Sequence, residues 1–356
     1  MIDTFEGVPG LLIVCFRTMS ETVPVTYDDW YRVLSKFKSE LGLEAPMFIQ
    51  YGDGDLTIND WTAGFNTSKD FFAKDGKVIT YGPMEDGYKE YLDTLAKWYA
   101  EGLLDSNFSI RDSHIPEDDL IFNDKIGAWT TYASWTGKEY YPGRGASNPD
   151  FNLVAAPIPA RNAGDERHIR ATDLQINTMD IAVSAKTKHM KEALTWMDFF
   201  YGEEGFRMMN YGLREGETYV VQPDGSLRWG PTILNNPEGM TLSEARVYYT
   251  ANNAFYEEYS RVSSNWAEVQ QQSQQTWVAS KDDWVIPAGV NLTADENQEF
   301  SSIMTEIRTY VTEETVKYIM GLSKTSFDDF KNQIKSMGID RATELYQTAL
   351  NRYLSR

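Results

Sequence analysis

The sequence predicts an α/β protein, because short apolar segments of strand length alternate with amphipathic segments of helix length along its 356 residues. One helix start is marked clearly, since Thr26 and Asp29 form a capping-box pattern and Gly42 stands where that helix should end. No internal repeat, low-complexity tract or long linker interrupts the alternation. We expect mainly parallel sheets, because strands separated by helices are commonly joined by helical crossovers.

The predicted strands are short apolar runs bounded by turn-forming residues. The run at 77–81, for example, is closed by Gly82 and Pro83, and the loop 158–170 is rich in Pro, Gly, Arg and Asp. The predicted strands comprise residues 11–16, 46–50, 77–81, 126–132, 152–157 and 180–184.

The predicted helices carry apolar residues three and four positions apart, which places those side chains on one face. Thr293 is a second N-cap, and Gly102 and Gly338 end or separate helices. The predicted helices comprise residues 27–41, 84–101, a segment from 116, 188–201, 203–211, a segment from 293, 326–337 and 340–353. The apolar stripe of the segment 188–201 comprises Met190, Ala193, Leu194, Met197 and Phe200.

The charge of the chain argues against anionic partners. It carries 33 basic and 53 acidic side chains, a formal net charge of −20, with 42% hydrophobic and 24% charged residues. Such a protein is repelled by phosphate backbones and by anionic lipid head groups, so we expect no binding to nucleic acid or to a membrane surface. The composition is that of a globular protein with one large core or two smaller ones.

The single cysteine excludes an intrachain disulfide and a cysteine-based zinc site. Cys15 lies in the apolar run 8–16 and is interpreted as a buried strand residue. That run is too short to span a bilayer, and Asp3 and Glu6 before it are acidic where a signal peptide needs positive charge. The chain is therefore expected to carry no export signal.

Neither a metal nor a cofactor is predicted. His114, His168 and His189 stand in polar surroundings without metal-ligand spacing, and exposed structural histidines are the better interpretation. The acidic stretch 52–60 has the oxygen content of a calcium loop, but Ile58 and Gly64 replace the glycine and the glutamate that the loop needs.

An enzyme is not indicated. The chain has no nucleophile elbow and no glycine motif for phosphate, and no pair of carboxylates is marked as acid and base by its position. Acidic residues are numerous enough to leave a glycan-active hydrolase with two carboxylates open as an alternative.

Aromatic residues at strand ends and in loops are the candidates for a binding site. Trp135 follows Ala133 and Ser134 at the end of a predicted strand, with Tyr132 at the same exit, and Trp61 stands in an irregular loop after another strand. Clefts of two-domain α/β proteins form at such places. For each of these aromatics the alternative is simple core packing, which carries most weight for Trp61.

The order of several motifs resembles the family-one extracellular solute-binding proteins, the group that includes maltose-binding protein and lipoproteins of Gram-positive bacteria. The likeness runs from about residue 11 to the end. The segments that carry it are 24–34 with its Pro-x-Thr-x-acidic-acidic-Trp pattern, 87–92 with 98–105, 122–128, which resembles a Phe-x-x-Gly-Lys-x-Ala strand entry, 191–205 with 210–212, and 335–340.

This resemblance implies a periplasmic-binding-protein-like fold of type II with two lobes, in which lobe one is incomplete. Residues 1–17 would be the end of lobe one and a crossing strand, 18–176 lobe two, 177–287 the returning part of lobe one, and 288–356 the closing helices of lobe two. Trp135 matches the family position whose indole stacks on a sugar ring. Trp61, Tyr132 and Asp173 are the other expected ligand-binding residues.

The resemblance also implies a function. The chain would be the solute-binding component of an ABC importer, holding a carbohydrate between two lobes, serving ABC permease subunits, catalysing nothing and acting as a monomer. It would stand outside the cytoplasm, lipid-anchored at the outer face of the cell membrane. Because the resemblance gives the first half of lobe one no counterpart in this sequence, a truncated form that binds nothing is a further alternative.

Overall fold

The computed structural model describes residues 11–15, 22–49, 61–110, 125–131, 153–168, 183–240, 242–250, 261, 263, 266, 268–277 and 283–356. The chain divides into two compact units. Unit 1 comprises Met1–Gly7 and Asp173–Ala267, and unit 2 comprises Val8–Thr172 and Glu268–Arg356. None of the helices in the described ranges combines the length and the apolar content that crossing a bilayer requires.

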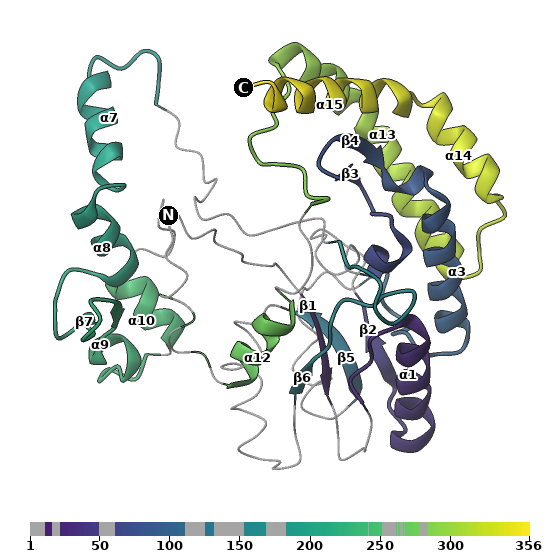
Figure 1. Ribbon diagram of the computed structural model, residues 1–356, viewed down its shortest axis with the longest axis horizontal. Helices are drawn as coiled ribbons and strands as arrows, with labels where there is room; N and C mark the ends of the chain where they lie inside the picture. The colour runs from purple at the N-terminus through teal and green to yellow at the C-terminus, as the bar shows by residue number, and fades with distance from the viewer. Residues whose placement is uncertain are drawn as a thin grey trace. The chain divides into compact units, whose positions relative to one another are not determined.

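Unit 2 is built on a sheet of four strands in the order β2-β5-β1-β6 (Figure 1). The strands are β1 (Leu11–Cys15), β2 (Ala45–Phe48), β5 (Ile126–Thr131) and β6 (Leu153–Ala155). β2 pairs with β5 in parallel, but β1 runs antiparallel to both β5 and β6. The prediction of mainly parallel sheets is therefore wrong. β1 enters unit 2 directly from the segment of unit 1 at the start of the chain, so no helical crossover imposes a parallel direction on it.

Helix α1 (Tyr27–Leu41) confirms the expected start and end. Thr26 accepts a hydrogen bond from the backbone N–H of Asp29, whose carboxylate accepts in return from the backbone N–H of Thr26 at 3.1 Å. Gly42 then ends the helix with a φ of 65°, the left-handed conformation that glycine adopts without steric cost. The buried face of the helix carries Tyr27, Trp30, Val33, Leu34 and Phe37, as its apolar spacing requires.

A hairpin and a second helix follow in unit 2. β3 (Phe71–Lys74), which was not predicted, pairs antiparallel with β4 (Val78–Tyr81) through a turn at Asp75 and Gly76, both with positive φ. The short 3-10 helices η1 (Ala63–Phe65) and η2 (Gly82–Met84) lead to α3 (Asp86–Ala100), which ends before Gly102 as expected.

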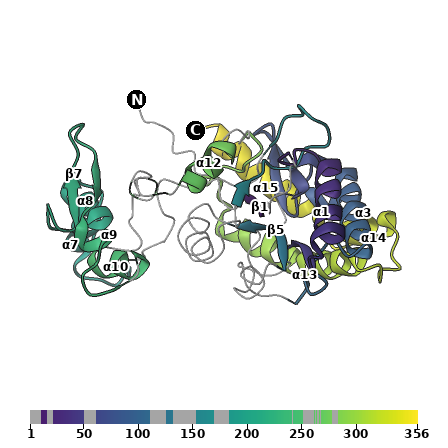
Figure 2. The same ribbon diagram turned by 90° about the horizontal axis from the view of Figure 1, so that it is seen from below.

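The C-terminal helices complete the core of unit 2. They are α12 (Glu268–Trp277), α13 (Ala294–Ile319), α14 (Phe327–Ser336) and α15 (Ile339–Leu354). α13 packs against both α3 and α15, and Figure 2 shows α1, α3, α13 and α14 grouped on one side of the sheet. Phe300, Met304, Ile307 and Val311 are buried on α13, in agreement with the predicted apolar face.

Unit 1 has a smaller core within the described residues. Its elements are α7 (Met190–Phe199), α8 (Glu203–Tyr211), the antiparallel hairpin of β7 (Tyr219–Val221) and β8 (Leu227–Trp229), α9 (Pro231–Leu234) and α10 (Leu242–Tyr249). The buried cluster comprises Tyr211, Tyr219, Trp229, Ile233 and Ala245. The predicted strand 180–184 is not formed at 183–184, and its other residues lie outside the described ranges, as does the helix predicted from 116.

The observed division of the chain differs from the expected boundaries. The second crossing lies at 267/268 instead of 287/288, and residues from Val8 onward already belong to unit 2. The reason is side-chain packing: Trp277 donates a hydrogen bond from Nε1 to the backbone oxygen of Ala156 at 3.0 Å, and Trp284 stacks on Phe72. Residues 268–277 and 283–287 are therefore fixed to the sheet and hairpin of unit 2.

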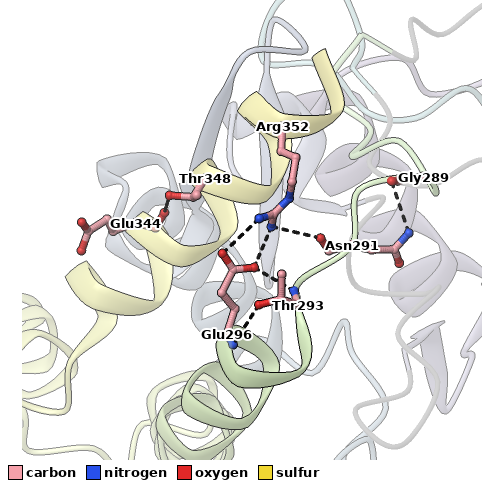
Figure 3. A network of polar contacts seen from close by, with 7 residues as sticks. All are labelled: Gly289, Asn291, Thr293, Glu296, Glu344, Thr348 and Arg352. Atoms are coloured by element: carbon pink, nitrogen blue, oxygen red, sulfur yellow. Dashed lines mark hydrogen bonds and ion pairs between the residues drawn. The ribbon is translucent and has the colours of Figure 1, made fainter. Parts of the chain in front are cut away.

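A polar network ties the first turn of α13 to the last turns of α15 (Figure 3). Glu296 accepts hydrogen bonds from both terminal nitrogens of Arg352, at 3.2 and 2.6 Å, and from the backbone N–H of Thr293 at 2.7 Å. Arg352 also donates to the backbone oxygen of Asn291 at 3.4 Å. The hydrogen bonds from Arg352 and then from Thr293 lower the pKa of Glu296 from 4.5 to about 2.

We expect Glu296→Gln to lower the melting temperature of unit 2 at pH 7. A carboxyl group with a lowered folded-state pKa stabilises the fold above its unfolded pKa, and this contribution is lost as the pH falls through the folded value. The difference between variant and wild type should therefore shrink from about pH 4.5 downward and vanish near pH 2. Thermal unfolding followed by circular dichroism across this range measures it.

Glu306→Gln is the matched control, because Glu306 is an exposed glutamate of the same helix. The control should leave the melting temperature unchanged at every pH. A deficit of Glu296→Gln that stays constant between pH 7 and pH 2 would show that its cause is not the carboxylate charge.

Candidate functional site

One edge of the sheet in unit 2 gathers the strand ends from which the predicted ligand-binding loops depart. Phe48 pairs with Trp129, so the carboxyl ends of β2 and β5 lie side by side. Leu11 pairs with Thr131 and Ile13 with Ala155, which brings the amino end of β1 and the carboxyl end of β6 to the same edge. Loops at the carboxyl ends of strands are the usual place for ligands in open α/β sheets.

Three of the four predicted binding residues lie outside the described ranges. In the sequence, Tyr132 is the next residue after Thr131, the last residue of β5, and Trp135 comes three residues after Tyr132. Asp173 is the first residue of the second segment of unit 1. All three stay predictions, since their side chains are not placed.

Trp61 lies inside the core of unit 2. Its side chain is 1% exposed, and its ring packs edge-on against Trp30 and Trp98, with centroid distances of 5.1 and 5.6 Å. This burial agrees with the interpretation of Trp61 as a core residue, because a ring enclosed in this way presents no face to a ligand. Trp61 is accordingly a core residue of unit 2 that packs against α1 and α3.

The chain around Trp61 is held by close contacts. The Tyr27 hydroxyl donates a hydrogen bond to the backbone oxygen of Trp61 at 2.7 Å. A Cβ atom on Gly64 would lie 2.5 Å from the backbone oxygen of Pro159 and 2.7 Å from the Tyr27 ring. Only glycine fits there, so this segment is locked between α1 and the chain that follows β6.

Three aromatic rings of unit 2, those of His168, Trp284 and Phe72, stack on one another. His168 packs face to face on Trp284 at 4.4 Å between centroids, and Trp284 packs on Phe72 at 5.1 Å. His168 Nδ1 lies 2.6 Å from a carboxylate oxygen of Asp283. The histidine is thus partly buried and paired, in contrast to the exposed residue that the sequence suggested. His189 is exposed at the N-cap of α7, and His114 is outside the described ranges.

The described residues contain no group of three or more His, Cys, Asp or Glu side chains that could hold a metal ion. The acidic stretch 52–60 lies outside them.

Unit 1 carries an open hollow of about 710 Å³ beside α10. Two glutamates, Glu238 and Glu244, and three apolar or aromatic side chains, Met240, Val247 and Tyr248, line it. No sequence pattern predicts this feature, because its residues come from a loop and a short helix with no recognisable spacing. Its walls combine an exposed aromatic ring with carboxylates, and no buried polar side chain among its lining residues converges on a ligand.

Comparison with protein families gives one match over more than half of the chain. Residues 3–205 match the model of the family described as bacterial extracellular solute-binding proteins. The amino-acid sequence has no significant match among the curated proteins.

Solved structures of similar fold cover almost the whole chain. The alginate-binding protein AlgQ2 is 20% identical with a TM-score of 0.74, and the match covers 97% of this chain and 74% of AlgQ2. An extracellular solute-binding protein from Bifidobacterium longum subsp. infantis is 16% identical with a TM-score of 0.76, covering 98% and 74%. An HMO-binding solute-binding protein from the same species is 16% identical with a TM-score of 0.73, covering 98% and 75%.

If Trp61 serves packing, Trp61→Ala should destabilise unit 2 by about 3–5 kcal/mol, the usual cost of removing a large buried aromatic ring. Urea unfolding followed by circular dichroism measures the loss. Trp61→Phe is the matched variant and should cost much less. It keeps an aromatic ring in the site, and the indole N–H that it removes has no hydrogen-bond partner among the described residues. Unchanged stability of Trp61→Ala would contradict the packing role.

Proposed function

This chain belongs to the bacterial extracellular solute-binding proteins, and from this premise we propose that it captures an oligosaccharide for an ABC importer. The observation that supports the proposal is the sheet edge of unit 2, where the carboxyl ends of β2 and β5 lie side by side, since Tyr132 and Trp135 follow β5 in the sequence. Two of the similar structures, at TM-scores of 0.74 and 0.73, are proteins named for binding alginate and HMO.

The proposed ligand contacts follow from the chemistry of sugars. The indole of Trp135 would stack on the apolar C–H face of a pyranose ring, since aromatic faces bury such surfaces with little loss of side-chain entropy. Tyr132 and Asp173 would form hydrogen bonds with ring hydroxyls, which fixes orientation and specificity. Trp61 would contribute indirectly, because its packing in the core would hold the chain next to the sheet edge in place.

The net charge of −20 favours a neutral oligosaccharide over a polyuronate. An anionic ligand would approach a protein of the same sign, which slows association and weakens binding at low ionic strength. We therefore propose that this chain differs in ligand class from a protein that binds alginate.

The remaining assignments follow from the family. The chain would act as a monomer outside the cytoplasm, lipid-anchored at the outer face of the cell membrane, and would deliver its ligand to ABC permease subunits. It would catalyse no reaction on the sugar. A form of the chain that folds and binds nothing is the main competing outcome of the test below.

Differential scanning fluorimetry against neutral and uronate oligosaccharides tests the proposal. At a ligand concentration of 100 times Kd, binding to the folded state adds about 2.7 kcal/mol, which corresponds to a rise of roughly 5–10 °C for a unit of this size. We expect this rise with a neutral oligosaccharide and not with alginate fragments. A flat response across the panel would contradict carbohydrate binding by this chain.

Trp135→Ala should weaken affinity for that oligosaccharide at least about tenfold, because stacking and the buried ring area are both lost. Isothermal titration calorimetry measures the change. Tyr248→Ala is the control, since Tyr248 is a 70% exposed aromatic residue of unit 1, and it should leave affinity unchanged. Equal affinity of Trp135→Ala and wild type would remove Trp135 from the site.

Incubation of the chain with the same oligosaccharides should leave them intact. Chromatography of the sugars after prolonged incubation distinguishes a receptor from a glycan-active hydrolase. Any product that increases with protein concentration would favour the hydrolase.

A further inference from the structure

The hollow of about 710 Å³ in unit 1 is formed by one short stretch of chain, the loop after α9 together with α10. α10 packs against α9, and Figure 1 shows the two helices close together. All the lining residues lie between 238 and 248, so the shape of the hollow is set locally. They are Glu238, Gly239, Met240, Glu244, Val247 and Tyr248.

The loop that forms one wall of the hollow is held in place by the side chain of Asn236. Its carboxamide oxygen accepts hydrogen bonds from the backbone N–H groups of Glu238 at 2.9 Å and Met240 at 3.3 Å. Its nitrogen donates to the backbone oxygen of Thr232 at 3.0 Å. Gly239 has a φ of 75°, the left-handed conformation that glycine adopts without steric cost. A wall that is ordered before binding loses little conformational entropy when a partner arrives.

The other wall of the hollow is the solvent face of α10. Ala245 is buried in the core of unit 1, and Tyr249 packs against the same core from the next turn. Glu244, Val247 and Tyr248 are exposed. The helix is therefore fixed through its inner face and presents a carboxylate, an aliphatic side chain and an aromatic ring to the solvent.

The lining side chains suit an occupant that is positively charged and partly apolar. Two glutamates and no basic side chain line the hollow, and the Glu238 carboxylate forms no ion pair within the described part of the chain. The face of a tyrosine ring such as that of Tyr248 attracts ammonium and guanidinium groups. Met240 and Val247 offer apolar surface to the aliphatic stems of Lys and Arg side chains.

The exposure of the walls favours a protein segment over a small molecule as the occupant. Small-molecule sites commonly bury about 70–90% of the ligand surface. Here Tyr248 is 70% and Val247 52% exposed, so these walls stand too far in the solvent to enclose a small ligand. A protruding segment of another protein would cover both side chains, and Tyr and Met are enriched in the buried centres of protein interfaces.

The charge of the chain narrows the partner further. At a net charge of −20 the chain repels anionic membranes, nucleic acids and further copies of itself, most strongly at low ionic strength. The same charge attracts a basic segment and raises its rate of association. Charge complementarity therefore favours a partner protein that presents basic residues.

We propose that this hollow is the docking site for an exposed segment of a partner protein in which Lys or Arg stands next to aliphatic residues. A basic side chain lies over the Tyr248 ring and pairs with Glu238 and Glu244. Its aliphatic neighbours cover Met240 and Val247. The hollow belongs to unit 1 and the proposed sugar site to the sheet edge of unit 2, so the inference goes beyond the proposed function and does not depend on carbohydrate binding.

Fluorescence anisotropy of labelled peptides tests this on the 356-residue chain. The probe is the basic peptide Lys-Leu-Arg-Leu-Lys-Leu, and its acidic counterpart is Glu-Leu-Glu-Leu-Glu-Leu. We expect saturable binding of the basic peptide alone, and weaker binding as the salt concentration rises from about 0.05 to 0.5 M, because exposed charges are screened. The absence of saturable binding up to about 1 mM protein would overturn the proposal.

Variants show whether the peptide binds at the hollow. Tyr248→Ala should weaken binding about tenfold, whereas Tyr248→Phe should keep most of the affinity because the ring face remains. Glu238→Gln with Glu244→Gln should weaken binding about three- to tenfold and reduce its salt dependence. Glu203→Gln with Glu204→Gln, at two exposed glutamates of α8, is the control of equal net charge and should leave binding unchanged. Equal loss with both glutamate pairs would show general attraction to an acidic protein and overturn the proposal.

Two measurements distinguish other occupants of the hollow. Free lysine amide that binds as tightly as the peptide would assign the hollow to small organic cations. Light scattering that shows twice the mass of 40.7 kDa, with Tyr248→Ala restoring the monomer, would assign it to a second copy. Either result would overturn docking of a basic segment. Because Tyr248→Ala should leave the oligosaccharide affinity unchanged, a failure of this inference is distinguishable from a failure of the proposed function.

Discussion

The packing of three tryptophans holds unit 2 together at the place where its sheet meets its helices. Trp30 from α1 and Trp98 from α3 both pack edge-on against Trp61, with interplanar angles of 70° and 85°. The Nε1 atoms of Trp30 and Trp61 have no hydrogen-bond partner among the described residues, so apolar burial and ring geometry hold this cluster. Both helices are thereby fixed against the described segment that begins at Trp61.

This constraint has a consequence for function. A loop that binds a ligand must be positioned by rigid elements, because the cost of ordering it is otherwise taken from the binding free energy. The pairing of β2 with β5 fixes the position of Thr131, the last residue of β5, after which the sequence continues toward Trp135. The tryptophan cluster fixes the helices α1 and α3 in the same unit. Unit 1 buries less of its apolar surface, because its core is small within the described residues and the apolar face of α7 is exposed. The two units therefore differ in how much of their apolar surface the chain itself buries.

Sequence patterns that involve only a few neighbouring residues predicted the structure correctly. The capping box at Thr26 and the N-cap at Thr293 placed the starts of α1 and α13 correctly, because a cap is made within four residues. The hairpin of β7 and β8 was missed, since each strand has only three residues and no alternating pattern can be read from so few. The strand β3 was missed in a stretch of mixed polarity, and the direction of β1 was wrong because pairing direction depends on residues more than a hundred positions away.

The sequence by itself determined the family, the alternation of strands and helices, and the approximate bounds of α1, α3, α8, α14 and α15, since all of these rest on neighbouring residues and on the order of motifs. It did not predict the helices α9, α10 and α12. Only the tertiary structure decided that Trp61 is a core residue, that residues 268–287 contribute to unit 2, and that the stripe of α7 is exposed. An aromatic residue or an apolar stripe has the same local pattern whether it is buried, exposed or in contact with a ligand. What distinguishes these cases is the presence of a packing partner, and that partner comes from a distant part of the chain.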